Sequence, residues 1–328
     1  MGIKMNDNAF FREGEFYAIK HLSDEIRAAS RSGGVFTALT DAVLNEGGLV
    51  FGCALDESFI AYHKAARTAD ERDGFRGSKY IQSDMRDTIT EVAKALAAGE
   101  RVLFSGTPCQ IAGLKSALAV KGLDKAPELI TVDILCHGVP SPRVWRDYLD
   151  YIEKKHKKKI SAVDFRNKTD YGWAAHTETV YFEDGSRYDS TDFRYLFYRH
   201  YVLRPSCFEC KYKARHVSDI TIADAWGIGK AAPDFNDDRG VSLVIPNTER
   251  GKELLESVRG RLDVICVDRE PMMQDALVRS VERPQNYDEF WSDYQSKGMG
   301  RILKKYARDG FKVRFKRGIK KILRMGRK

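Results

Sequence analysis

The sequence predicts a mixed α/β fold, built as a layered mixed sheet with flanking helices, followed by a basic amphipathic helix at the C-terminus. Strand and helix patterns alternate between residues 15 and 154, the pattern becomes more strand-like from residue 160, and basic residues crowd positions 301–328. Hydrophobic residues make up 43% of the chain and charged residues 31%, a globular composition that argues against disorder, collagen and coiled coil.

Each element follows from its hydrophobic period and from the residues that begin or end it. In the first half we expect strands at 15–20, 49–55, 101–104 and 129–135, and helices at 33–46, 88–98, 111–119 and 141–154. Gly47-Gly48 ends the helix at 33–46, and Pro142 suits the first turn of the helix at 141–154. In the second half we expect a strand from residue 180 into a hairpin turn at Asp184-Gly185, strands at 220–223 and 241–245, and a helix at 251–259.

The positive charge is concentrated at the C-terminal end. Lys and Arg number 55 against 47 Asp and Glu, a formal net charge of +8, yet residues 301–328 alone hold thirteen basic residues and one acid, Asp309. Residues 1–300 are therefore slightly acidic, and the body lacks the basic face that specific nucleic-acid binding requires.

Apolar residues recur at helical spacing within this tail, at Phe311, Phe315, Ile319, Ile322 and Leu323. A basic amphipathic helix can lie on an anionic membrane surface; docking on the body and a solvated tail are the alternatives. Because no stretch is long enough to span a membrane and the N-terminus lacks a secretory apolar segment, we expect a cytoplasmic protein. The tail would be its peripheral contact with the inner face of the membrane.

The six cysteines of such a chain point to metal or redox chemistry rather than to disulfides. Cys207 and Cys210 form a Cys-x-x-Cys, and the single residues Cys109 and Cys136 also lie beside Gly and Pro. An iron–sulfur cluster needs four thiolates, and zinc uses the same set, so both remain open. The other two, Cys53 and Cys266, lie in apolar strand patterns and are expected to be small buried hydrophobes.

Three polar, glycine-bearing loops lie in the first half, at 30–34, 76–80 and 105–108. The first precedes a helix, whose N-terminal N–H groups favour an anion. None of them matches Gly-x-Gly-x-x-Gly or a Walker sequence. Together they suit a nucleotide diphosphate such as the one in FAD, and ordinary surface turns are the alternative.

Six motifs follow one another in an order that resembles a known family. They are Ser32-Gly33-Gly34-Val35-Phe36-Thr37, Arg76-Gly77-Ser78-Lys79-Tyr80-Ile81-Gln82-Ser83-Asp84, Leu103-Phe104-Ser105-Gly106-Thr107-Pro108-Cys109-Gln110-Ile111-Ala112-Gly113-Leu114, Cys136-His137-Gly138-Val139-Pro140-Ser141-Pro142, Arg204-Pro205-Ser206-Cys207-Phe208-Glu209-Cys210 and Ser218-Asp219-Ile220-Thr221-Ile222-Ala223-Asp224-Ala225-Trp226-Gly227. The chain is similar, from about residue 16 to residue 253, to the coenzyme F420 hydrogenase/dehydrogenase beta subunit family.

The resemblance implies an iron–sulfur flavoprotein oxidoreductase that carries FAD and a [4Fe-4S] cluster and exchanges electrons with a small redox partner or substrate. It places the cluster ligands on Cys109, Cys136, Cys207 and Cys210, and it makes coenzyme F420 a candidate substrate. Bacterial relatives accompany polysaccharide-building enzymes, which suggests a polysaccharide pathway. A non-catalytic electron-transfer or docking subunit, and a zinc-stabilised protein without a redox role, are the alternatives.

Many relatives carry an N-terminal ferredoxin domain, whereas this sequence has no cysteine before Cys53, so we expect no such domain in it. Its electrons are expected from a separate ferredoxin, a partner subunit or a reduced nicotinamide. With the resemblance, the chain divides into a lead-in at 1–14, a flavin-binding part at 15–120, a part with the Cys-x-x-Cys at 121–265, a helical extension at 266–300 and the basic tail at 301–328.

The residues expected to bind the cofactor come from these motifs. For the FAD phosphates or ribityl chain they are Ser32, Gly33, Gly34, Thr37, Gly77, Ser78, Lys79, Gln82, Gly106 and Thr107, with Asp224 and Trp226 further along. Lys79 would hold a phosphate or steady a negative reduced flavin, unless it is a solvated surface lysine. His137 would supply a proton, unless it is a structural hydrogen-bonder, and Trp226 is either a stacking platform or a packing residue.

Overall fold

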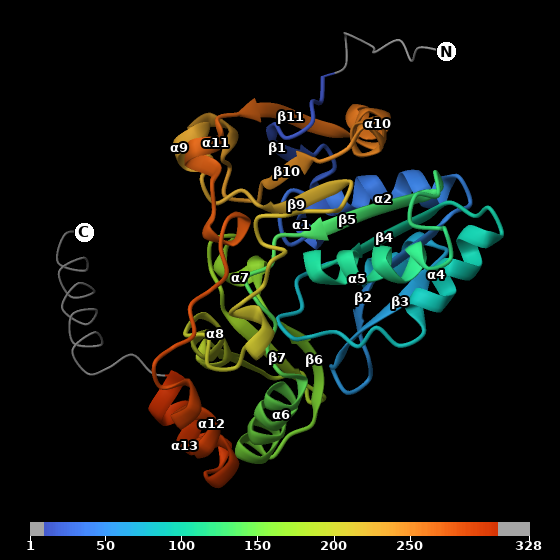
Figure 1. The fold of residues 1–328 in the computed structure, drawn as a ribbon. Helices are drawn as coiled ribbons and strands as arrows, with labels where there is room; N and C mark the ends of the chain where they lie inside the picture. Colours follow the sequence, from blue (N-terminus) through green and yellow to red (C-terminus); the bar gives the residue numbers. More distant parts are fainter. Residues whose placement is uncertain (1–9, 308–328) are drawn as a thin grey trace, which may run out of the picture.

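The computed structural model describes residues 10–307, and an eight-stranded mixed sheet organises it (Figure 1). The strand order is β11-β1-β10-β9-β5-β4-β2-β3. The strands are β1 (Phe16–His21), β2 (Leu49–Leu55), β3 (Ala61–Ala66), β4 (Val102–Gly106), β5 (Leu129–Ile134), β9 (Ile220–Asp224), β10 (Ser242–Pro246) and β11 (Leu262–Val267). The inner strands β2, β4, β5 and β9 run parallel to one another. On one side of them, β3 pairs antiparallel with β2. On the other side, β10, β1 and β11 follow β9 in that order, and each of these pairs is antiparallel.

Helices cover both faces of this sheet. The helices α2 (Val35–Asn45) and α10 (Glu249–Val258) pack together on one face, and α4 (Thr88–Ala97) and α5 (Pro108–Ala119) pack together over the other. Shorter helices complete this unit: α1 (Asp24–Ala29), α3 (Ala69–Asp73), α9 (Ile228–Ala231) and α11 (Arg269–Met272). The predicted mixed α/β sheet with flanking helices is thus confirmed.

A smaller unit has its own apolar core beside the sheet. Its elements are α6 (Pro142–His156), β6 (Ile160–Asp164), α7 (Lys168–Tyr171), β7 (Glu178–Phe182), β8 (Arg187–Ser190), α8 (Asp192–Tyr198), α12 (Tyr287–Ser296), α13 (Met299–Ile302) and the π-helical turn η5 (Leu303–Ala307). Its three strands form a separate sheet in the order β6-β7-β8. Trp145, Tyr148 and Phe197 are buried at its centre.

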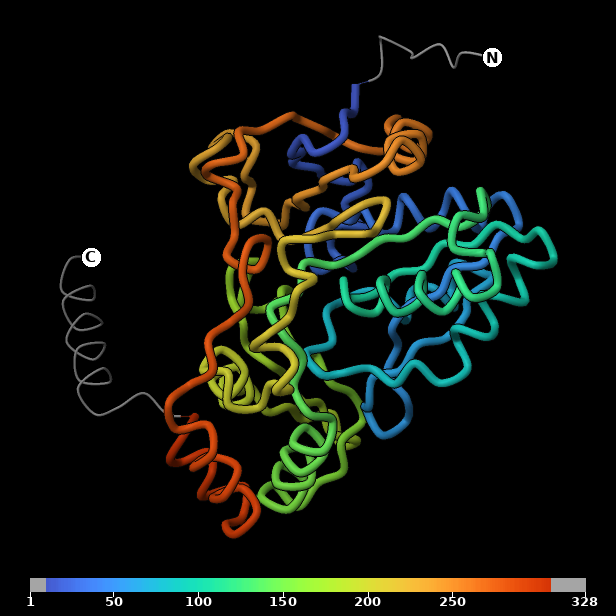
Figure 2. The backbone as a smooth tube through the Cα atoms, viewed as in Figure 1, coloured from blue at the N-terminus to red at the C-terminus, as the bar shows by residue number. Residues whose placement is uncertain are grey.

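The chain passes between the two units more than once (Figure 2). It enters the smaller unit after β5, returns to the large sheet at β9, and leaves it again after β11 for α12 and α13. Strands from the expected segments 15–120 and 121–265 therefore share one sheet. Short 3-10 turns lie on these connections and loops, at Pro205–Cys207, Pro233–Phe235, Arg259–Arg261 and Asp275–Leu277.

The predicted elements agree with the structure most closely where a segment is entirely apolar. The strand expected at 49–55 is β2 with the same bounds, whereas the helix expected at 111–119 begins earlier, at Pro108. A capping box between Thr107 and Gln110, with Pro108 in the first turn, starts α5 at that point. Cys109 consequently lies in the first turn of a helix.

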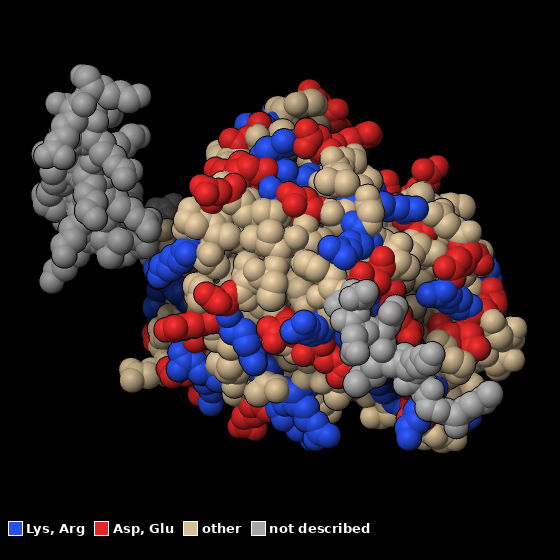
Figure 3. All heavy atoms as spheres, turned by 90° about the horizontal axis from the view of Figure 1, so that it is seen from above, with Lys and Arg blue, Asp and Glu red and all other residues tan. Residues whose placement is uncertain are grey.

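The basic tail expected at 301–328 lies outside the described residues from position 308 onward. Its first residues end α13 and form η5, where Ile302, Leu303 and Tyr306 are buried in the smaller unit. On the face seen from above in Figure 3, acidic and basic side chains are interspersed and neither sign dominates. Within residues 10–307, no helix is both long and apolar enough to cross a membrane.

Candidate functional site

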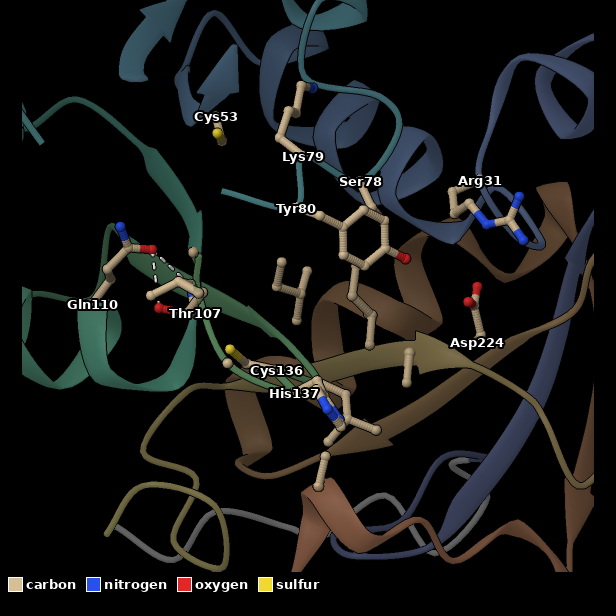
Figure 4. A pocket seen from close by; sticks show the side chains of 18 of the residues that line it. Arg31, Cys53, Ser78, Lys79, Tyr80, Thr107, Gln110, Cys136, His137 and Asp224 are labelled. Atoms are coloured by element: carbon tan, nitrogen blue, oxygen red, sulfur yellow. Dashed lines mark hydrogen bonds between the residues drawn. The ribbon is translucent and has the colours of Figure 1, made fainter. Parts of the chain in front are cut away.

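A cavity of about 1050 Å³ lies where the large sheet meets the smaller unit (Figure 4). Ser105 and Gly106 at the end of β4, Ile134 at the end of β5 and Asp224 at the end of β9 line it from the sheet. The smaller unit contributes residues that include Arg166 and Tyr198. The cavity thus opens at the carboxyl ends of the parallel strands, where open α/β sheets bind their ligands.

All three glycine-bearing loops line this cavity. From the expected cofactor-binding set it is lined by Ser32, Gly34, Gly77, Ser78, Lys79, Gln82, Gly106, Thr107, Asp224 and Trp226. These loops lie far apart in the sequence and meet because the strands that precede them, β1, β3 and β4, belong to one sheet. Gly33 and Thr37 are not part of the lining.

Gly33 and Thr37 instead hold the first loop in place. Gly33 packs so closely on the sheet that a Cβ atom there would lie 2.0 Å from the carbonyl oxygen of Ile19. Its N–H donates to the Ser242 hydroxyl at 3.0 Å. Thr37 is fully buried, and its hydroxyl accepts a hydrogen bond from Arg76 at 3.2 Å, which ties the first loop to the second.

Lys79 turns its ammonium group toward its own loop. The Nζ atom donates to the carbonyl oxygens of Gly74 and Arg76, both at 2.9 Å. Burial lowers the pKa of Lys79 to about 8, and the thiol of Cys53 opposes that shift. Two of its three donors are therefore already used within residues 74–79.

The four cysteines expected to be ligands, Cys109, Cys136, Cys207 and Cys210, all line the same cavity. The sulfur of Cys109 lies 3.2 Å from the Thr107 hydroxyl, and the sulfur of Cys207 accepts from the Val139 N–H at 3.5 Å. In the described part of the chain, no group of three or more His, Cys, Asp or Glu side chains is arranged to hold a metal ion.

The thiols lie close enough to influence one another electrostatically. Burial raises the pKa of Cys136 to about 12, with Lys213 opposing the shift and Cys109 and Cys207 adding to it. Burial also raises the pKa of Cys207, where Cys109 and Cys210 contribute in the same direction. The raised pKa values keep Cys136 and Cys207 in the neutral thiol form when nothing is bound. A bound cation would be needed to stabilise the thiolate form of these two cysteines.

Lys213 is a buried cation beside these cysteines. It is 4% exposed, and its ammonium donates to the carbonyl oxygen of Cys136. It follows the Cys-x-x-Cys by three residues, and sequence reasoning missed it because a lysine in a basic segment carries no local signal of burial.

His137 forms a hydrogen-bonded pair with His200. Their Nε2 atoms lie 2.9 Å apart, and Nδ1 of His200 lies 2.9 Å from the carbonyl oxygen of Glu282. A carbonyl only accepts, so neutral His200 has its proton on Nδ1, and neutral His137 has its proton on Nε2. Burial, followed by His200 and Lys213, lowers the pKa of His137 to about 4. In this state Nδ1 of His137 is an acceptor.

Arg166 connects the expected residues Asp224 and Trp226. Its guanidinium donates to Asp224 at 2.8 Å and to the Tyr80 hydroxyl at 3.1 Å, and it lies 5.0 Å from the centre of the Trp226 ring. Trp226 is 43% exposed and stacks on the buried ring of Trp173 at 4.9 Å. One face of Trp226 therefore packs on the protein, although the residue keeps substantial exposure.

The expectation that Cys53 and Cys266 are small buried hydrophobes is wrong for Cys266. Cys266 is exposed because β11 is the last strand on one side of the sheet formed by residues 10–307, where it pairs with β1. Cys53 is half-buried on β2 and lines the cavity, as Figure 4 shows. An apolar strand pattern does not reveal which strand lies at an edge.

Comparison with known proteins identifies the family. The model of the C-terminal region of the coenzyme F420 hydrogenase/dehydrogenase beta subunit family matches residues 99–269, more than half of the chain. The chain belongs to this family. The resemblance inferred from the motifs is thereby confirmed, and the matched segment contains all four expected ligand cysteines.

Solved structures of other proteins share the fold of this chain. One is a chain of the F420-reducing [NiFe] hydrogenase complex from Methanosarcina barkeri, studied by xenon derivatization. It is 17% identical, with a TM-score of 0.58, and the match covers 89% of this chain and 96% of that one. At this identity the match shows the fold. Among curated proteins, no significant match is found.

Proposed function

We propose that this chain is a flavin-dependent iron–sulfur oxidoreductase, in which electrons pass between a four-cysteine cluster and FAD held in one cavity. One observation carries the proposal: three glycine-bearing loops and four cysteines from separate parts of the sequence line the same cavity. Its volume of about 1050 Å³ is just above the ~300–1,000 Å³ common for ligand pockets, which suits a dinucleotide.

The four cysteines supply the kind and number of donors that the proposed cluster needs, although in the described residues no three of them stand in metal-binding geometry. Four thiols are what a [4Fe-4S] cluster binds, and the Val139 N–H already points at the Cys207 sulfur. When bound, the cluster supplies single electrons and FAD pools two of them for hydride transfer. The ligands would be Cys109, Cys136, Cys207 and Cys210.

The chain's own residues would bind and orient these groups. The first loop and the Gly77–Ser78 turn would hold the phosphates, and burial in the cavity would keep water from the reduced flavin. His137 would offer Nδ1 as a hydrogen-bond acceptor, because its Nε2 proton is shared with His200. Lys213 would offset the negative charge of four thiolates.

The electron donor is proposed to be a separate, acidic ferredoxin, and coenzyme F420 remains a candidate substrate. Arg204 and Lys211 are exposed and line the cavity near the Cys-x-x-Cys, so they offer a positive contact to such a donor. Reduction by a ferredoxin should then slow as salt is raised. A salt-independent rate would contradict this choice of donor.

The test is an anaerobic absorbance spectrum with iron, zinc, acid-labile sulfide and flavin measured on the same sample. We expect about four irons and one FAD per chain. Cys210→Ser should lose most of the iron, whereas the matched control Cys266→Ser, an exposed cysteine outside the cavity, should keep it. Zinc in place of iron, with no flavin, would refute the proposal.

A further inference from the structure

The cavity has several cations near its glycine-bearing loops, and most of them already have partners. Arg76 donates to Thr37 and lies 3.0 Å from Asp73, and Lys79 donates to two carbonyls of its own loop. Arg166 is paired with Asp224 at 2.8 Å. These three side chains are committed to holding the protein's own groups.

Arg31, in the loop at 30–34, is different. Its two Nη atoms donate to the carbonyl oxygens of Trp173 and, at 3.4 Å, of Arg166, which fixes the guanidinium in place. Its Nε atom is buried and has no hydrogen-bond partner. Within residues 10–307, no carboxylate forms an ion pair with it. Since a guanidinium has five N–H donors, three are left without a partner among residues 10–307.

The carboxylates that attract Arg31, Asp224 and Asp164, are shared with Arg166, which repels it. Lys168 donates to the carbonyl oxygens of Arg27 and Ser30, at 2.5 and 2.6 Å, and so fixes the backbone before Arg31 without contributing negative charge. Arg166 is neutralised by Asp224. A half-buried cation that shares its nearby acids and has no ion pair of its own is incompletely compensated, and an anion bound in the cavity would compensate it.

The backbone beside Arg31 suits the same anion. Gly34 has a positive φ of 89° and caps α2 without a side-chain hydrogen bond, and the next two residues, Val35 and Phe36, line the cavity. The first N–H groups of an α-helix have no partner within the helix. Figure 4 shows Arg31 at this side of the cavity, opposite Cys53 and Gln110.

We propose that Arg31, rather than Lys79, is the cation that holds the diphosphate of FAD. This inference rests on the proposed function and adds a residue that the motifs did not indicate. Arg31 is preorganised by its two backbone contacts, and a planar guanidinium suits phosphate oxygens better than a mobile ammonium does. Lys79 then keeps its role in shaping the loop at 74–79.

The test compares FAD with riboflavin, which has the same ring system and no phosphate. The full-length chain, with its cluster, is dialysed anaerobically against each flavin and the bound fraction is measured. Arg31→Met should weaken FAD binding about 10- to 100-fold, as expected when charge-assisted hydrogen bonds are lost, and should leave riboflavin binding within about two-fold. Arg31→Lys should recover part of the loss.

Two further variants make the result specific. Arg67→Met removes an exposed arginine that pairs with Glu100 outside the cavity, and it should change neither affinity. Lys79→Met should not lower FAD affinity selectively. Equal losses of FAD and riboflavin in Arg31→Met, no loss at all, or a selective loss in Lys79→Met would overturn the assignment. A wild-type chain that binds neither flavin would instead refute the proposed function itself.

Discussion

Gly33 and Gly77 lie in two loops at the same cavity, and each position needs glycine for a different reason. At Gly33 the backbone of β1 and β10 leaves no room, with a Cβ atom 2.0 Å from one backbone atom and 2.6 Å from another. Gly77 has open space around it, and its φ of +79° disfavours side chains. Close packing thus requires glycine at position 33, and the backbone conformation favours it at position 77.

Alanine should separate these two causes. Gly33→Ala forces β1, β10 and the first loop apart, so we expect it to lower the unfolding free energy by about 3 kcal/mol or more. Gly77→Ala should cost about 1–2 kcal/mol, because alanine is strained in a left-handed conformation. Urea denaturation measures both. Equal losses would contradict the difference in packing.

Some residues of the site could be predicted from the sequence and others could not. Motif residues such as Ser32 and Thr107 could be chosen because they lie in glycine-bearing loops just before helices, and they do line the cavity. Arg31, Lys213 and His200 could not, since each takes its role from a partner more than sixty positions away. No local pattern encodes such a contact.

Among the elements, β7 and α8 are joined by a buried carboxyl group. Glu178 of β7 accepts hydrogen bonds from the Phe193 N–H at 2.8 Å, the Arg194 N–H at 3.3 Å and the Tyr148 hydroxyl at 3.0 Å. Burial nevertheless raises the pKa of Glu178 to about 7, against the opposing effect of these hydrogen bonds. The N-terminus of α8 is therefore held by an acid that titrates near neutral pH.

This predicts a pH dependence of stability. The folded chain binds the Glu178 proton more tightly than the unfolded chain, whose pKa is near 4.5, so the stabilisation is present at low pH and is lost as pH rises toward 7. Glu178→Gln should abolish that fall, which is on the order of 1–3 kcal/mol. Denaturation at pH 5, 6 and 7.5 measures it.

The matched control is Glu183→Gln, an exposed acid at the end of the same strand, which should leave the pH profile of the wild type unchanged. A Glu178→Gln profile that still falls between pH 5 and 7 would show that other groups cause the fall.

Helices and strands could be predicted from the sequence where a segment is apolar along its whole length. β2, buried from both faces over most of its length, has the bounds that its apolar run predicts. The order of the strands was not predictable, because β11 and β1 add to the sheet by contacts between distant segments. The exposure of Cys266 follows from that order and was missed for the same reason.

At the scale of the whole molecule, one cavity is shared by two units with separate apolar cores. The large sheet supplies the glycine-bearing loops, and the smaller unit supplies Arg166 and Tyr198. A ligand that fills the cavity contacts both units, so its binding should stabilise them together.

FAD is therefore expected to raise the melting temperature of the whole chain. At a hundred-fold excess over its dissociation constant, mass action gives about 2.7 kcal/mol. Differential scanning calorimetry with and without FAD measures the shift, and ATP, which lacks the isoalloxazine ring, is the control. Two transitions, of which FAD moves one alone, would contradict a shared site.

The exposed thiol of Cys266 has a practical consequence for work on this protein. Within residues 10–307 it lies on an edge strand, and the outer side of an edge strand presents backbone groups with which a second molecule can pair. In air, two copies brought together along this edge can form a covalent disulfide dimer, which gel filtration would report as an oligomer. Molecular mass should accordingly be measured on Cys266→Ser or in the presence of a reductant, so that a disulfide dimer formed by air oxidation is not taken for a native oligomer.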